Sequence, residues 1–166
     1  MLVGSDLTQE ELKLIQTFAG ESISGAKIAH FGTEGVKSVS QDADADKILK
    51  RKSKTSNLNG VEKLGIQPFS GETDAEVVLV FRGGRAELPE LKGKKVFGFG
   101  VFNKNETQNY TGVLPGAAYS EKDGTIFNFS GVEQKFKRAV MPPGKSKYLS
   151  EVFMIWKSTK NKEGAA

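Results

Sequence analysis

The chain contains few residues of the types that most often do chemistry in enzymes. Its 166 residues include one histidine, His30, and no cysteine. Without cysteine there can be no disulfide, no thiolate zinc site and no cysteine-bound iron–sulfur cluster within the chain. Residues 20–24 place Ser22 between small residues but lack the last glycine of the nucleophile elbow G-x-S-x-G. The sequence therefore predicts no catalytic residue and no metal ligand set.

A run of alternating aspartates is the nearest approach to a metal motif. Asp42, Asp44 and Asp46 have the spacing that opens a calcium loop. Lys47, however, stands where the sharp turn needs glycine, and Ser53 stands where a bidentate glutamate is needed. The alternative interpretation, which we favour, is an acidic start to a short helical turn.

A glycine pair after a strand pattern is a second candidate for ligand binding. Residues 82–85 read Arg-Gly-Gly-Arg and follow the apolar run 76–81. Glycine lets backbone N–H groups approach a phosphate, and the ends of parallel strands are where nucleotides bind. Neither G-x-G-x-x-G nor a Walker sequence is present. A structural turn is the favoured interpretation, with a nucleotide-binding loop as the alternative.

The clearest helix signal begins at Thr8. Thr8 and Glu11 form a capping box that satisfies the first N–H groups of a helix. Apolar residues then recur at helical spacing along one face: Leu12, Ile15 and Phe18. Gly20 is placed to end the helix. The paired carboxylates of Glu10 and Glu11 are interpreted as solvated helix charges.

Strand patterns flank this helix and continue beyond it. Residues 2–4 precede the helix, residues 26–31 alternate after it, and residues 94–102 form a glycine-interleaved strand. The unbroken apolar run 76–81 is typical of a strand covered on both faces. Residues 148–156 carry apolar side chains at helical spacing and predict a last helix. We therefore expect an α/β (or α+β) fold with a compact mixed sheet and few helices.

Length and charge indicate one domain spanning residues 1–166. Residues 33–59 are polar and are expected to form a surface excursion, and residues 158–166 a basic flexible tail. The formal net charge of +4 is small and lies partly in this tail, so no nucleic-acid binding is expected. No apolar run has membrane length, and the first residues lack the features of a signal peptide. We expect a soluble, cytoplasmic chain without direct membrane insertion.

The most distinctive stretch of the chain covers residues 113–144. A short apolar strand is stopped by Pro115, which cannot donate to a β-ladder. Asp123 and Gly124 then form a turn in which Gly124 is expected to take positive φ. Residues 125–129 alternate as a half-buried strand, and residues 142–144 read Pro-Pro-Gly.

This order of residues resembles the C-terminal segment of molybdopterin-type oxidoreductases. It resembles most closely the molybdopterin-related subunit of NADH-quinone oxidoreductase (respiratory complex I). The matching residues are Val113, Leu114, Pro115, Glu121, Asp123, Gly124, Thr125, Asn128, Gly131, Gln134, Pro142, Pro143 and Gly144. Residues 46–49, 57–60 and 64–66 also fit the pattern of that subunit. Ser130 stands where the family has glutamate, and Val132 stands where it has arginine.

The resemblance implies a truncated relative of the molybdopterin oxidoreductase C-terminal domains. It implies a non-catalytic structural domain, without cofactor, whose partners are other domains or subunits of NADH-quinone oxidoreductase. Such a chain could lie at the inner membrane through the complex. The alternative is a module that still binds a pterin or nucleotide. Its candidate ligand residues are Glu121, Asp123, Gly124, Thr125, Asn128 and Gln134.

Overall fold

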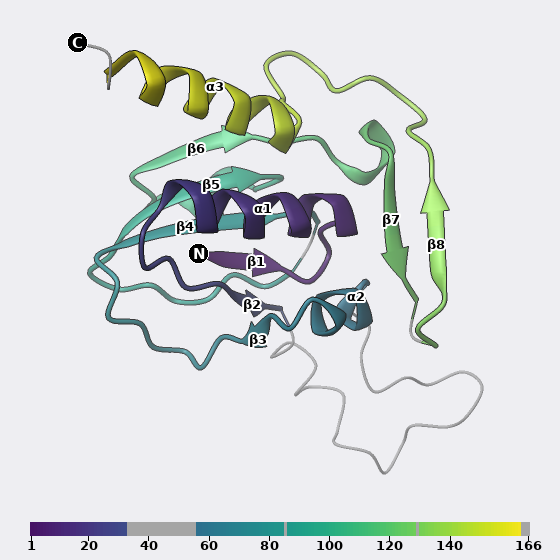
Figure 1. Cartoon of the computed structure of the whole chain (residues 1–166), viewed down its shortest axis with the longest axis horizontal. Coiled ribbons are helices and arrows are strands. Elements are labelled where there is room, and N and C mark those ends of the chain that lie inside the picture. Colours follow the sequence, from purple (N-terminus) through teal and green to yellow (C-terminus); the bar gives the residue numbers. More distant parts are fainter. Residues whose placement is uncertain (33–55, 85, 129, 164–166) are drawn as a thin grey trace.

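Six parallel strands form the central sheet of the molecule (Figure 1). The computed structural model describes residues 1–32, 56–84, 86–128 and 130–163. The strands are β1 (Leu2–Gly4), β2 (Ala29–Phe31), β3 (Gln67–Pro68), β4 (Val77–Arg82), β5 (Lys95–Gly100) and β6 (Gly112–Pro115). Their order in the sheet is β3-β2-β1-β4-β5-β6, and every neighbouring pair is parallel. The predicted α/β class is confirmed.

Antiparallel pairing among the described residues is confined to a separate hairpin made by β7 (Gly124–Phe127) and β8 (Glu133–Phe136). The hairpin stands beyond the edge of the sheet to which the strand arrows point in Figure 1. Two 3₁₀ turns, η2 (Lys104–Thr107) and η3 (Tyr119–Glu121), precede β6 and β7 respectively. Parallel and antiparallel strands therefore belong to different sheets, where the sequence suggested one mixed sheet.

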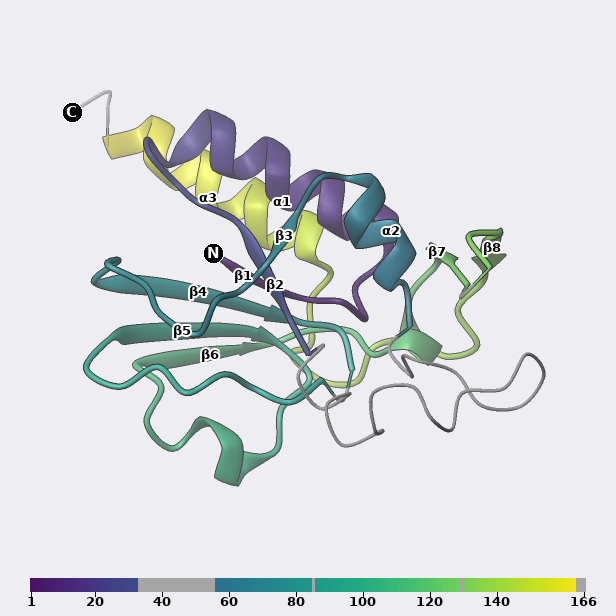
Figure 2. The same ribbon diagram turned by 90° about the horizontal axis from the view of Figure 1, so that it is seen from below.

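The helices in the described ranges lie on one side of the sheet, as Figure 2 shows: α1 (Gln9–Ser22), α2 (Leu58–Lys63) and α3 (Leu149–Glu163). The capping box of Thr8 and Glu11 is present. Gly20 does not end α1, so that prediction is wrong by two residues. The Ile23 N–H still bonds the Ala19 carbonyl, and the chain turns only after it. The predicted last helix is confirmed and extends to Glu163.

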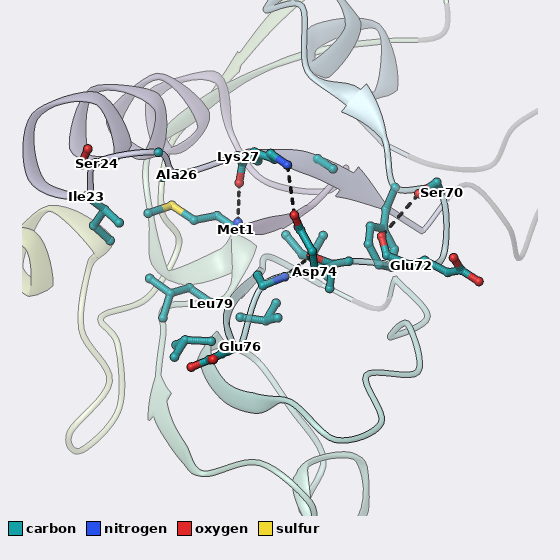
Figure 3. A pocket seen from close by; sticks show the side chains of 18 of the residues that line it. Met1, Ile23, Ser24, Ala26, Lys27, Ser70, Glu72, Asp74, Glu76 and Leu79 are labelled. Carbon is teal, nitrogen blue, oxygen red and sulfur yellow. Dashed lines mark hydrogen bonds and ion pairs between the residues drawn. The ribbon is translucent and has the colours of Figure 1, made fainter.

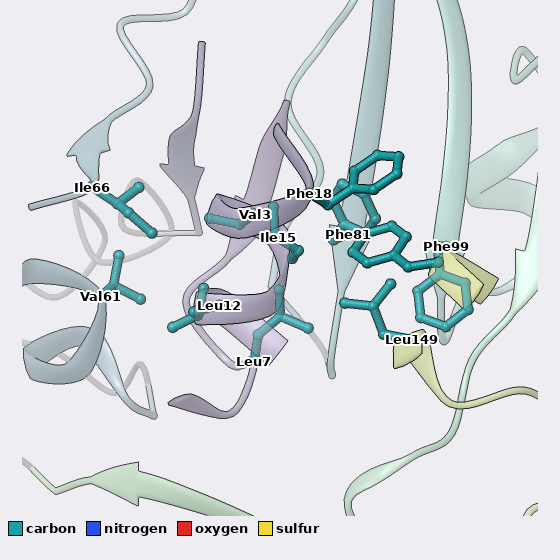
Figure 4. Packing of buried hydrophobic residues seen from close by; sticks show 11 residues of the cluster. Val3, Leu7, Leu12, Ile15, Phe18, Val61, Ile66, Phe81, Phe99 and Leu149 are labelled. Carbon is teal, nitrogen blue, oxygen red and sulfur yellow. The ribbon is translucent and has the colours of Figure 1, made fainter. Parts of the chain in front are cut away.

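The core between the helices and the sheet is built from side chains of all layers (Figure 4). Its buried members are Val3, Leu7, Leu12, Ile15, Phe18, Val61, Ile66, Phe81, Phe99, Leu149 and Phe153. The rings of Phe18 on α1 and Phe153 on α3 stack with centroids 4.0 Å apart. This contact fixes the two helices side by side over the sheet, where α1 crosses from β1 to β2.

The opposite face of the sheet is covered by loops. Its buried side chains are Leu2, Phe31, Val78, Val80 and Val96. The loop between β4 and β5 packs on them through Ala86, Leu88 and Leu91, and the loop between β5 and β6 does so through Tyr110. Both faces of β4 are thus covered, which explains its unbroken apolar run.

Two segments named from the sequence are described only in part. Residues 33–55, with the aspartate pattern at 42, 44 and 46, lie outside the described residues, as do 164–166. Within the expected excursion, Asn57 is buried and α2 begins at Leu58. Within the expected tail, residues 158–163 continue α3. None of the helices that the structure describes is both long and apolar enough to cross a membrane.

Candidate functional site at the carboxyl edge of the sheet

The strand order creates a switch point between β1 and β4, where the chain leaves the sheet in opposite directions. In open parallel sheets this crevice, outside the carboxyl ends of the strands, is where ligands bind. Here the residues that follow the two strands are Ser5 and Asp6 after β1 and Gly83 and Gly84 after β4. By its topology, this edge is therefore the strongest candidate for a functional site.

Asp6 occupies the switch point. Its carboxylate accepts hydrogen bonds from the backbone N–H groups of Gly83 at 3.1 Å and Ala86 at 3.4 Å. A side chain at Gly83 would place Cβ 2.7 Å from the Asp6 carbonyl oxygen, and one at Gly84 would place it 2.6 Å from the Asp6 carboxylate. The glycine pair thus allows Asp6 to approach, and the N–H group that a phosphate would use is bound to Asp6. This geometry supports the structural-turn interpretation of residues 82–85.

The hairpin segment docks on the first turn of α1. The Lys122 ammonium lies 2.8 Å from both carboxylate oxygens of Glu11, and the two side chains are 5% and 15% exposed. The Thr125 N–H and hydroxyl donate to the Glu10 carboxylate at 3.0 Å and 2.6 Å. Glu10 and Glu11 are therefore not simply solvated helix charges, as the sequence suggested. They hold the hairpin.

The pKa of Glu10 reflects this docking. Partial burial alone would raise the pKa of its carboxyl group. The hydrogen bonds from Thr125, together with those from Thr8 and the backbone, outweigh burial and hold the pKa below its ordinary value. The ionised form of Glu10 is the form that binds the hairpin.

Asn57 joins three segments behind this contact. Its amide nitrogen donates to the Leu7 carbonyl at 2.6 Å. Its amide oxygen accepts from the Phe127 N–H at 2.7 Å and from the Gln9 side chain at 3.3 Å. Asn57 is 1% exposed and has left-handed backbone angles, with φ 58°. It therefore ties the β1–α1 loop, α1 and β7 to the start of α2.

Gly124 departs from the sequence prediction. It is the first residue of β7, and positive φ is not found there, so the predicted glycine turn is wrong. Glycine is required because the backbone approaches α1 closely. A Cβ at this position would overlap the Thr8 side chain and would lie 2.8 Å from the Phe136 ring. Docking against Thr8, and not turn geometry, explains this glycine.

Tyr119 closes the same edge from η3. Its hydroxyl donates to the Asp6 carbonyl and lies 3.2 Å from the Ser56 hydroxyl. Burial raises the pKa of the Tyr119 phenol well above its ordinary value, so the phenol stays neutral and acts as a donor. The ring also packs edge-on against Phe136 of the hairpin. Tyr119 thus links the switch point to the hairpin.

The remaining candidate ligand residues form local contacts and do not converge on one cavity. Glu121 accepts from the Ala118 N–H at 2.9 Å, and Asp123 accepts from the Arg138 N–H at 2.9 Å. The side chain of Asn128 accepts from two N–H groups of its own turn, at residues 130 and 132. Gln134 is exposed on β8. The hydrogen bond from Arg138 and that from Lys137 lower the pKa of Asp123.

Arg82 points away from the switch point, into the loop-covered face. Its guanidinium donates to Glu106 at 2.7 Å, and this contact, followed by the Asn103 N–H, lowers the pKa of Glu106. Arg82 is 6% exposed, and its Nε atom has no hydrogen-bond partner within the described part of the chain. Arg85 lies outside the described residues.

Neither His30 nor any acidic cluster forms a metal site in the described ranges. His30 is 3% exposed, and burial lowers the pKa of its imidazole. No group of three histidine, aspartate or glutamate side chains comes together in the described ranges in a way that could hold a metal ion.

Comparison with protein families places a known pattern on the hairpin. Residues 101–154 match the family model of molybdopterin oxidoreductase. The match runs from the end of β5 to the first turns of α3 and includes Tyr119, Lys122 and Thr125. The segment that closes the carboxyl edge is therefore similar to molybdopterin oxidoreductases. A comparison with curated proteins finds no match.

The residues that receive the hairpin carry little signal in the sequence. Asp6 lies in a short stretch before the helix cap, and Lys122 is one of many lysines, so neither is predicted as a contact. The signal for Asp6 is the glycine pair at 83 and 84, which indicates a close approach but does not name what approaches. Asn57 belongs to a recognised pattern, although nothing local indicates that it is buried.

Proposed function

We propose that this chain is a non-catalytic structural and interaction domain of an NADH-quinone oxidoreductase, respiratory complex I. It corresponds to the C-terminal region of the molybdopterin-related subunit. In this role it supports electron transfer from NADH to quinone only as part of the complex. It carries no redox group of its own, and its partners are other domains or subunits of that complex. The domain would lie in the cytoplasm, at the inner membrane through the complex.

The observation that carries the proposal is the internal use of the polar groups at the carboxyl edge. The carboxylate of Asp6 binds the β4 loop, and Glu10 and Glu11 bind Thr125 and Lys122. A ligand at this edge would have to displace these bonds, several of which involve charged groups of low exposure. The same residues explain the family-like segment as packing, which needs no cofactor.

The similarity of residues 101–154 to molybdopterin oxidoreductases supports the wider family. The assignment to the complex I subunit rests on the resemblance of the signature residues between 113 and 144 and on the lack of cysteine. Ser130 and Val132 replace a glutamate and an arginine of that signature, and both lie at the turn of the hairpin. Their positions are consistent with a loop that no longer faces a cofactor.

Two measurements on the purified protein test the lack of a cofactor. Metal analysis and a fluorescent pterin extract should show no iron, molybdenum or pterin. Calorimetric titration with GDP, as a probe for a pterin guanine dinucleotide, should give no binding heat. Near-stoichiometric pterin, or saturable GDP binding that is lost in Thr125→Val, would overturn the proposal and favour the ligand-binding module.

Association with the complex is tested in cells. The chain, tagged and produced at its native level, should co-purify and cross-link with subunits of NADH-quinone oxidoreductase. A strain that produces an unrelated tagged protein of similar size and charge is the control. Recovery as a lone monomer, in cells that assemble the complete enzyme, would contradict the proposed role.

A further inference from the structure

The amino edge of the sheet, opposite the site described above, carries a pocket of about 630 Å³ (Figure 3). Its walls are the turn that follows α1 (residues 23–27), the loop between β3 and β4 (residues 69–76), the first residues of β1 and β4, and Trp156 of α3. The volume lies within the range of about 300–1,000 Å³ that is usual for ligand pockets. Because nucleotides bind at the carboxyl edge of such sheets, this position favours a docking function.

The interior of the pocket offers apolar surface that the fold leaves uncovered. Val77 is 50% exposed and Trp156 46% exposed, and both line the pocket. Partly buried Ile23 and Leu79 lie between them and the core. Figure 3 shows Ile23 and Leu79 on neighbouring walls of the pocket. Large apolar side chains that line a concave surface are typical of places where another apolar group packs.

The rim of the pocket is acidic on a chain whose formal net charge is +4. Glu72, Asp74 and Glu76 lie on one loop of the lining. Asp74 pairs with Lys27 at 3.6 Å across the pocket, with both side chains about 85% exposed. Within the described part of the chain, neither Glu72 nor Glu76 forms an ion pair. The pocket therefore presents unpaired negative charge around an apolar interior.

We infer that this pocket is the docking site for a basic, amphipathic peptide segment of a partner protein. The inference rests on the proposed role as an interaction domain and adds the surface and the chemistry of the partner. Apolar side chains of the segment pack on Val77 and Trp156, while its lysine or arginine side chains pair with Glu72 and Glu76. The carboxylates stand on the exposed rim and not inside the pocket. A ligand that reaches both regions must therefore be extended, which favours a peptide over a small cation.

Trp156 provides a direct signal, because it is the only tryptophan and lines the pocket. The probe is the peptide Ac-Leu-Lys-Phe-Lys-Leu-NH2, titrated while tryptophan fluorescence and backbone amide shifts are recorded. Saturable changes are expected in Trp156 and in the amides of residues 23–27 and 69–79. The acidic peptide Ac-Leu-Glu-Phe-Glu-Leu-NH2 should bind at least tenfold more weakly.

The charge variants make the test specific. The triple variant Glu72→Gln, Asp74→Asn, Glu76→Gln should raise the Kd of the basic peptide by about tenfold, since each exposed pair contributes modestly. The matched control Glu87→Gln, Glu90→Gln, Glu133→Gln changes net charge equally away from the pocket and should change the Kd less than twofold. All six side chains are exposed, so both variants are expected to fold.

Several results would overturn the inference. These are no saturable change, equal affinity for the acidic peptide, an equal effect of the control variant, or equally tight binding of spermidine, which would indicate a small-cation site. Failure here is distinguishable from failure of the proposed function. If the tagged chain still co-purifies with the complex, and the pocket variant does so equally, the proposed function stands and the docking surface lies elsewhere.

Discussion

Replacing Asn57 by alanine should be among the most destabilising single changes outside the apolar core. Asn57 is 1% exposed and makes hydrogen bonds with Leu7, Phe127 and Gln9. Alanine would leave a carbonyl, a backbone N–H and a side-chain amide without their partner. At about 1 kcal/mol for each group, this amounts to roughly 3 kcal/mol. The left-handed φ of 58° adds about 1 kcal/mol for alanine.

Asn57→Gly separates these two contributions. Glycine tolerates the left-handed backbone, so it should lose the hydrogen bonds without the strain and be about 1 kcal/mol less destabilising than alanine. Urea unfolding, followed by the fluorescence of Trp156, measures both variants. Trp156 packs edge-on against Phe18 and therefore reports the contact between α1 and α3. A loss of less than about 1 kcal/mol in Asn57→Ala would refute the reasoning.

Three further changes probe the docking of the hairpin. Lys122→Met should lower the free energy of unfolding by about 3–5 kcal/mol, because it leaves the Glu11 charge buried, and adding Glu11→Gln should recover part of this loss while keeping the helix cap; additive losses in a double-mutant cycle would contradict the pairing. Gly124→Val should cost about 1–3 kcal/mol through overlap with Thr8, and pairing it with Thr8→Ser should reduce the cost if overlap is the cause. In Glu10 the folded-state pKa lies below the ordinary value of 4.5, so its stabilisation is present above about pH 4.5 and is lost as the pH falls through the folded pKa; acid titration of the unfolding free energy should show a smaller decline for Glu10→Gln, and an unchanged decline would count against the bond to Thr125.

The elements of the fold were largely predictable from local sequence patterns. The capping box marked the start of α1, and the apolar run at 76–81 identified β4 as a strand covered on both faces. The strand expected at 26–31 is shorter in the structure, where β2 begins at Ala29. Ala29 pairs with Leu2, the first residue of β1, so no strand residue lies beside the positions before it. Boundaries depend on partners, which local pattern does not reveal.

The carboxyl edge could not be predicted in the same way because its contacts are distant in sequence. Glu10 and Thr125 are 115 residues apart, and Asp6 and Gly83 are 77 apart. A carboxylate in the first turn of a helix is ordinarily explained by the helix dipole, and that explanation hid its second role. Gly124 shows the same limit, since a glycine after aspartate signals a turn equally well whether or not another side chain lies against it.

The docking contacts also determine how the family-like segment should be understood. Residues 101–154 match the molybdopterin oxidoreductase model, whereas the groups that satisfy Lys122 and Thr125 lie on α1, outside that match. A buried ammonium without its carboxylate is strongly unfavourable, so the hairpin depends on the N-terminal half of the chain for its stability. Conversely, the first turn of α1 presents two carboxylates that would repel each other without the hairpin. The two parts therefore form one cooperative unit, and the edge where related folds bind ligands serves here to join them.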